Sequence, residues 1–121
     1  MATTRWRAPE LSTASDDAAE HYRDGIAALV AGAAHAAAHF DAALVADPTF
    51  ALAHVAAAVA ARRPVELPAV APTTRGERHH VETARTWLVG DLRHACDLRR
   101  EHLLEFPGDL LIVTLPLLVT R

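Results

Sequence analysis

The apolar residues of this chain recur with the spacing of α-helices. Tyr22, Ile26 and Leu29, for example, fall at i, i+4 and i+7, which places their side chains on one face of a helix. The same period returns in later stretches, and the segment from residue 109 onward is apolar nearly all round. From this pattern we predict helices over residues 15–31, 34–46, 48–62, 75–89, 91–106 and 109–120.

Capping signals mark the ends of these helices. Ser15 precedes two aspartates, and Thr74 stands three residues before Glu77, which is the spacing of a capping box. Gly32 and Gly90 follow apolar runs, where a glycine can take the left-handed conformation that ends a helix. These signals divide much of the chain into helix–turn–helix units.

Prolines mark the remaining boundaries. Asp47 and Pro48 suit the N-cap and the first turn of the third helix, whereas prolines at 64, 68 and 72 exclude a helix from residues 63–74. Residues 1–14 have no apolar period and indicate a flexible leader. The predicted organisation is a single helical domain at 15–121, with a hairpin at 15–46, an extra helix at 48–62, a proline-rich linker at 63–74, a second hairpin at 75–106 and an apolar terminal helix at 109–120.

Composition favours an all-α fold and argues against several kinds of partner. Half of the 121 residues are apolar, aromatic residues make up only 5%, and alanine is frequent, which suits helices packed through small side chains. The net charge of −3 gives no support for binding to nucleic acid or to an anionic membrane. No stretch resembles a signal peptide or a bilayer span, so we expect a cytoplasmic protein. The single cysteine, Cys96, excludes an internal disulfide, and we expect it to be a small buried residue.

An arrangement of small residues and prolines occurs twice in the chain. The repeated positions are Gly32, Ala36 and Pro48 in the first half and Gly90, Ala95 and Pro107 in the second. Together with Gly25, Phe40 and Ala43, this pattern resembles the tetratricopeptide repeat, a helix–turn–helix unit of about 34 residues. The resemblance implies antiparallel helical hairpins that form a short right-handed α-solenoid. The second unit departs from the pattern, because Arg99 and His102 replace an aromatic residue and an alanine.

A narrower resemblance lies in residues 75–111, RGERHHVETARTWLVGDLRHACDLRREHLLEFPGDLL. This stretch is similar to the tetratricopeptide repeat protein 38 family in its Glu-Arg-x-His-Val start, its Gly-Asp turn and its Pro-x-Asp-Leu-Leu end. The resemblance covers roughly residues 18–111. It implies a helical-repeat protein with no established catalytic residues. Because members of that family are longer, we expect this chain to be a short member or a fragment.

The resemblance and the lack of a legible catalytic motif favour a non-enzymatic scaffold that binds a protein or a peptide. By resemblance, the binding groove is lined by the first helix of each pair. The residues expected in it are Tyr22, Glu77, His80, Ala84 and Trp87. The alternative is that Tyr22, Ala84 and Trp87 belong to the core.

The terminal segment predicts a second kind of interface. It is almost without polar residues, and an exposed apolar patch of this kind indicates a surface that another chain covers. We expect either a homo-oligomer or packing against missing C-terminal repeats. The residues expected in this contact are Leu110, Leu111, Val113, Leu115, Leu117 and Leu118.

Eight histidines raise the question of metal chemistry. His35 and His39 share one helical face at i, i+4, and His94, Asp97 and Glu101 share another at i, i+3 and i+7. No third ligand accompanies the first pair, and arginines beside the second set favour surface ion pairs. We therefore predict no metal, no cofactor and no catalytic residue. A metal-dependent enzyme, or a metal-binding helical protein, is the alternative.

Overall fold

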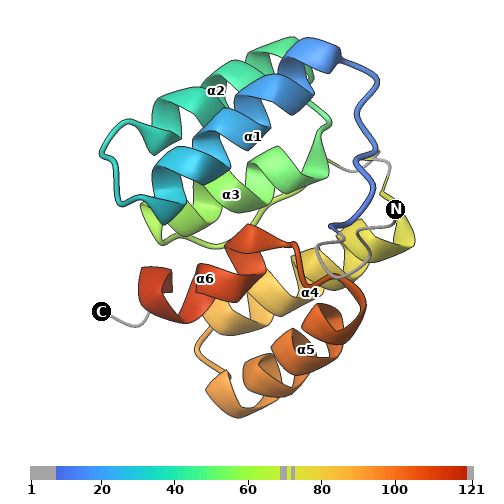
Figure 1. Ribbon diagram of the computed structural model, residues 1–121, viewed down its shortest axis with the longest axis vertical. Helices are drawn as coiled ribbons and strands as arrows, with labels where there is room; N and C mark the ends of the chain where they lie inside the picture. Colours follow the sequence, from blue (N-terminus) through green and yellow to red (C-terminus); the bar gives the residue numbers. More distant parts are fainter. Residues whose placement is uncertain (1–7, 69–70, 72, 120–121) are drawn as a thin grey trace.

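The computed structural model describes residues 8–68, 71 and 73–119, with the backbone alone at residue 119. These residues form six α-helices and no strand, which confirms the predicted all-α class (Figure 1). The helices are α1 (Asp16–Val30), α2 (Ala36–Ala46), α3 (Ala51–Ala61), α4 (Arg75–Leu88), α5 (Leu92–Glu105) and α6 (Leu110–Val119). Each lies inside a stretch for which the sequence predicts a helix.

The capping signals act as the sequence predicts. The Ser15 hydroxyl accepts a hydrogen bond from the Ala18 N–H at the start of α1. Thr74 and Glu77 form a reciprocal capping box at the start of α4. Gly32 and Gly90 have φ angles of 75° and 88°, the left-handed conformation that a residue with a side chain adopts only at a cost.

The third helix begins three residues later than predicted. Asp47 does not cap it: the Asp47 carboxylate accepts hydrogen bonds from the N–H and the hydroxyl of Thr49, and another from the hydroxyl of Thr13. These bonds hold Asp47, Pro48 and Thr49 in a turn, which is the local alternative to a helix that aspartate favours. Phe50 then takes the N-cap position without a side-chain cap.

The helices form two groups, and α6 lies between them (Figure 1). Helix α2 packs on both α1 and α3, and α4 pairs with α5. Helix α6 contacts α1 and α3 on one side and α4 and α5 on the other. This last helix, together with the direct packing of α3 on α4, joins the two parts of the fold into one core. Among the described residues, no helix has the length and apolar character needed to cross a membrane.

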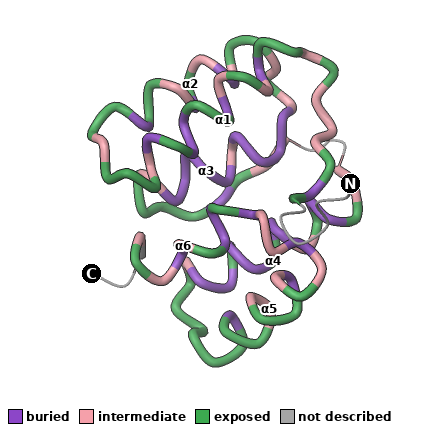
Figure 2. Tube along the Cα trace, in the orientation of Figure 1, coloured by how far each residue is buried: buried purple, intermediate pink, exposed green. Residues whose placement is uncertain are grey.

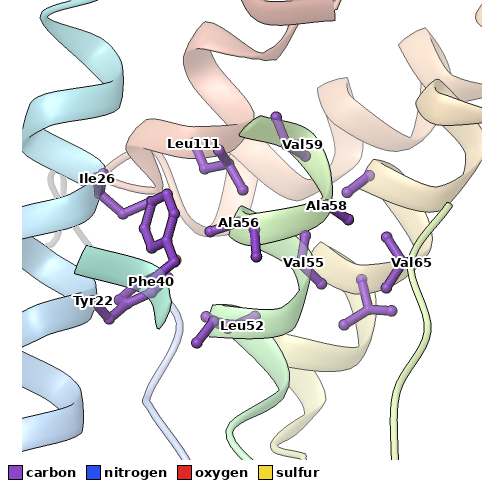
Figure 3. Close-up of a cluster of buried hydrophobic side chains, with 14 of the residues drawn as sticks. Tyr22, Ile26, Phe40, Leu52, Val55, Ala56, Ala58, Val59, Val65 and Leu111 are labelled. Atoms are coloured by element: carbon purple, nitrogen blue, oxygen red, sulfur yellow. The ribbon is translucent and has the colours of Figure 1, made fainter. Parts of the chain in front are cut away.

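Helix α3, predicted as an extra helix outside the hairpins, is the most buried element of the core (Figure 2). Its valines and alanines point toward neighbours on several sides, and Leu111 of α6 lies against it (Figure 3). Small side chains also let α1 and α2 approach closely. A Cβ atom added at Gly25 would lie 2.4 Å from Cε1 of Phe40, so only glycine fits at this crossing.

Helix α5 is mostly exposed, which corrects one expectation (Figure 2). Cys96, predicted to be buried, is exposed, and Leu92 exposes 46% of its surface. Both follow from the position of α5 at the outside of the fold, where α4 and α6 cover it on one side only. Ala95, expected as a close-packing residue, is fully buried there.

Residues 8–14, which the sequence indicates as part of a flexible leader, contact the helical body. Pro9 is buried, and the N–H and hydroxyl of Ser12 both donate to the Glu77 carboxylate, at 3.0 and 3.1 Å. The Thr74 hydroxyl donates to the Glu10 carbonyl oxygen. This part of the leader is thus attached to the first turn of α4. Residues 1–7, which include Trp6, lie outside the described part of the chain.

Helix α6 contains Pro116, which has no N–H to donate to the Ile112 carbonyl oxygen four residues earlier. The Arg99 guanidinium of α5 supplies the replacement. Its Nε donates to the Ile112 carbonyl oxygen at 2.9 Å, and one of its terminal nitrogens donates to the Val113 carbonyl oxygen at 2.8 Å. Arg99, which departs from the aromatic residue of the repeat pattern, therefore compensates for a proline inside the neighbouring helix.

We predict that Arg99→Met lowers the free energy of unfolding by about 1–3 kcal/mol, because two backbone carbonyl groups lose a charged donor. The loss should be smaller when Pro116→Ala is also present, since residue 116 then has an N–H for the Ile112 carbonyl oxygen. Urea denaturation of the single and double variants measures this coupling. Arg100→Met is the control, because Arg100 forms an exposed ion pair with Asp97, and it should change stability by less than about 0.5 kcal/mol. Equal losses in both backgrounds would contradict the compensation.

Candidate functional site

Three buried polar side chains meet where α4, α5 and the start of α6 come together. Oδ2 of Asp109 lies 2.7 Å from Nδ1 of His80 and 2.7 Å from Nε2 of His102. His80, His102 and Asp109 expose only 0%, 1% and 5% of their surfaces. One carboxylate oxygen thus binds histidines from two different helices in the interior of the protein. We call these three residues the histidine–aspartate cluster.

Local structure fixes the position of each member of the cluster. His80 lies on the buried face of α4, and His102 lies in the last turn of α5, where its carbonyl oxygen accepts from the Phe106 N–H. The turn at Pro107 and Gly108 then reverses the chain and brings Asp109 back toward both helices. Asp109 also stands at the start of α6, where its carbonyl oxygen accepts from the Val113 N–H and its Oδ1 lies 3.5 Å from the Ile112 nitrogen.

His79 extends the cluster toward the surface. Its Nδ1 lies 3.0 Å from Nδ1 of His102, and the two rings are stacked with their centroids 5.0 Å apart. Nε2 of His79 lies 3.8 Å from the carboxylate of exposed Glu101. One set of proton positions satisfies these contacts: His80 Nδ1–H and His102 Nε2–H donate to Asp109, and His79 Nδ1–H donates to the lone pair on Nδ1 of His102.

The cluster affects the ionisation of the groups around it. Burial alone would raise the pKa of Asp109, but the charge of His80 and the hydrogen bonds from His102 and His80 hold that pKa well below its usual value. Burial lowers the pKa of His79, and His102 lowers it further, against the opposing effect of Glu101. Burial, followed by the charges of Asp109 and Glu77, raises the pKa of Tyr22 well above its usual value. Asp109 is therefore a carboxylate, and Tyr22 a neutral phenol, at physiological pH.

Two buried nitrogen atoms close to this region have no hydrogen-bond partner among the described residues. They are Nε2 of His80 and Nε1 of Trp87, both on α4. An unpaired polar atom in the interior costs free energy that an apolar side chain would not. Of the two ring nitrogens of His80, Nδ1 therefore contacts Asp109, and Nε2 has no hydrogen-bond partner among the described residues.

Glu77 is a second buried carboxylate, and its contacts assign it a structural role. It accepts from Ser12 and from the backbone N–H of Thr74, and its own N–H donates to the Thr74 hydroxyl. Gly76 lies beside it, and a Cβ atom added at Gly76 would come within 3.0 Å of Pro9 and of Phe106. Glu77 therefore anchors the leader to α4.

A pocket of about 310 Å³ lies beside Asp109, the one member of the cluster in its lining. Its wall includes Tyr22 and Asp109, and exposed Arg23 and Leu110 also line it. The complete lining is Ala8, Pro9, Leu11, Tyr22, Arg23, Ile26, Ala27, Leu52, Gly108, Asp109, Leu110 and Leu111. The pocket is mostly apolar and has one carboxylate at its wall.

The residues expected to line a partner groove lie in the interior. Tyr22, Glu77, His80, Ala84 and Trp87 are all classed as buried, none of them with more than 7% of its surface exposed. They do not form an exposed groove in this structure, because α3 and α6 pack against α1 and α4. The burial of Tyr22, Ala84 and Trp87 agrees with the alternative that these three are core residues.

The histidine sets considered from the sequence remain near the surface. The rings of His35 and His39 are neighbours, 5.4 Å apart between centroids, and His35 is exposed. His94, Asp97 and Glu101 are exposed, and Asp97 pairs with Arg100 as the sequence predicts. Within the described part of the chain, the group whose donor atoms lie close enough to share an ion is His80, His102 and Asp109.

Sequence reasoning missed His102 and Asp109. His80 and Asp109 are 29 residues apart, and no helical period relates residues in different elements. His102 departs from the alanine of the repeat pattern, and that departure was the available signal. Comparison with protein-family models, curated proteins and solved structures finds no match to this chain.

We predict that Asp109→Asn lowers the free energy of unfolding by about 2–4 kcal/mol, because a neutral amide oxygen replaces a carboxylate that accepts from two buried histidines. Chemical denaturation at pH 7 measures the loss. Asp97→Asn is the matched control: its carboxylate is exposed, so the change should be less than about 0.5 kcal/mol. Equal small effects of both substitutions would contradict the importance of the cluster for folding.

The stability that Asp109 provides should depend on pH. Since its pKa is lower in the folded than in the unfolded state, this contribution is complete above the unfolded pKa of about 3.9 and declines as pH falls below it. The difference in unfolding free energy between the wild type and Asp109→Asn should therefore become smaller as the pH falls from about 5 to about 2. A difference that stays constant over this range would show that Asp109 is not ionised in the folded protein.

Proposed function

We propose that this chain is a non-enzymatic helical interaction module that associates with a second copy of itself through the outer face of α6. The observation that carries this proposal is the exposure of three apolar side chains on that helix. Leu110, Val113 and Leu117 expose 46%, 36% and 72% of their surfaces at i, i+3 and i+7. This spacing places them along one face, and we call them the outer stripe.

The opposite face of α6 is already used by the fold. Leu111, Ile112 and Leu115 are buried in the core, which fixes how far the helix can rotate. The six residues expected in self-association therefore divide: Leu111 and Leu115 are core residues, Leu118 is partly buried, and the outer stripe remains available. Because the core holds one face, the other is presented as a rigid surface.

A second copy of the chain is the occupant that this surface fits best. Helix α6 carries no charged residue, so the stripe offers no electrostatic feature that would select a different partner. Two identical apolar helices can cover each other about a two-fold axis, the commonest symmetry of soluble oligomers. Exposed apolar residues on other helices, such as Leu104 on α5, do not form a comparable stripe at i, i+3 and i+7.

The packing of the first hairpin supports the finer proposal that the module is related to tetratricopeptide repeats. Gly25 lies against Phe40, as expected if a small residue lets the paired helices approach. Gly32 and Gly90 end corresponding helices in both hairpins. Two residues of the second hairpin depart from the repeat pattern, and both have partners in this fold. Arg99 donates to a carbonyl oxygen of α6, and His102 contacts Asp109.

We predict that the wild-type chain is dimeric or larger at micromolar concentration and that Val113→Glu/Leu117→Glu makes it monomeric. Each glutamate would place a charge inside the apolar contact, at a cost that no partner group offsets. Size-exclusion chromatography with multi-angle light scattering measures the mass as a function of concentration. Leu104→Glu, an equally apolar and 82% exposed position on α5, should keep the wild-type mass. A monomeric wild type would disprove the proposal, and an effect of Leu104→Glu alone would move the contact to α5.

A further inference from the structure

We infer that His80, His102 and Asp109 form a binding site for a divalent transition-metal ion, and that zinc is the ion their donor atoms fit best. Each residue offers one ligand atom, and the three atoms lie within 4.8 Å of one another. All three side chains are buried. The inference is independent of the proposed self-association, because no member of the cluster belongs to the outer stripe.

The donor set and its positions suit zinc. Two imidazole nitrogens and one carboxylate oxygen, with a fourth position left for water, are the ligands of open zinc sites. Ligands at about 2 Å from a tetrahedral ion are roughly 3.3 Å apart, so the two 2.7 Å contacts of Asp109 need to widen by several tenths of an ångström. The two histidine nitrogens, which lie within 4.8 Å of each other, need the same ligand spacing. The cluster comes from two helix segments and a turn, and side-chain rotations would have to provide both adjustments.

Changes of tautomer free the nitrogen atoms that would bind the ion. In the cluster without metal, the protons of His80 and His102 lie on the nitrogens that face Asp109. Metal binding requires lone pairs there, so the protons move to Nε2 of His80 and Nδ1 of His102. Nδ1 of His102 then donates to Nδ1 of His79, whose own proton moves from Nδ1 to Nε2, the nitrogen that faces Glu101.

The residues behind His102 have the arrangement of an outer ligand shell. Metal-bound histidines usually donate their second N–H to a neighbouring acceptor, which fixes the orientation of the ring. Here the acceptor is His79, whose other nitrogen faces Glu101 at 3.8 Å. Stacking of the His79 and His102 rings at 5.0 Å adds to this orientation. The same contacts would therefore hold His102 in place for an ion.

The pocket beside Asp109 brings solvent close to one of the three ligands. It has a volume of about 310 Å³, and exposed Arg23 and Leu110 in its lining place one end of it at the surface. His80 and His102 are not among its lining residues, so an ion that enters from the pocket has to pass Asp109.

The test is titration of zinc chloride into the chelator-treated full chain, followed by isothermal titration calorimetry and by thermal denaturation. We expect one equivalent of zinc to bind and to raise the melting temperature. His80→Gln should abolish this binding, whereas His79→Gln, which removes only the outer partner, should weaken it by about 10- to 100-fold. Circular dichroism of each variant without metal shows whether it is folded.

The matched control is His35→Gln/His39→Gln, which removes the pair of neighbouring histidines on α2 and its N-cap that could bind zinc near the surface. It should keep the wild-type stoichiometry and affinity. The inference is wrong if the wild-type chain binds no zinc, if the control variant loses the site, or if folded His80→Gln keeps it.

Nitrogen-15 NMR of the histidine rings in the wild-type chain tests the site even if the variants fail to fold. Before zinc is added, the ring proton of His102 should be on Nε2, and after one equivalent it should be on Nδ1. The Nδ1 signal of His80 should shift in the same step. Zinc binding that leaves these ring signals unchanged would place the ion elsewhere and overturn the inference.

Discussion

Asp109 accepts hydrogen bonds from histidines of two helices through one carboxylate oxygen, while its backbone begins a third helix. The position of α6 depends on this residue, because the first turn of α6 starts where His80 and His102 hold the chain. Since α6 contacts α1 and α3 as well as α4 and α5, the same contact contributes to how the two parts of the fold meet, beside the direct packing of α3 on α4. The polar cluster and the apolar core are therefore parts of one arrangement.

The apolar core around α6 has little tolerance for rotation or displacement. Helix α3 buries small side chains on several sides. Where α1 crosses α2, Phe40 lies so close to Gly25 that a single added carbon atom would not fit. Pro116 would weaken the last helix, but Arg99 supplies donors to the carbonyl groups that the proline leaves or disturbs. A chain with few aromatic residues thus obtains a specific core from close backbone approach and from a few directed hydrogen bonds.

Features that depend on neighbouring residues in the sequence could be predicted, and features that depend on contacts between distant elements could not. The helices, the Ser15 cap, the Thr74–Glu77 capping box and the left-handed glycines arise from local chemistry. The late start of α3 depends on the bonds of Asp47 to nearby Thr49 and also on its bond to Thr13, 34 residues away. The burial of His80 likewise depends on Asp109, which returns to it only after α5 and a turn. A helical period shows that a residue faces inward, but it does not show which polar group it meets there.

The two faces of α6 link the cluster to the surface. Asp109 directly precedes Leu110, which both lines the pocket and belongs to the outer stripe. The residue that binds both histidines and the first residue of the outer stripe are therefore adjacent in the chain. Buried polar residues are costly when an apolar core could replace them, and they persist where a position must be specified or a ligand held. In this chain, the histidine–aspartate cluster specifies the position of the helix that carries the exposed apolar surface.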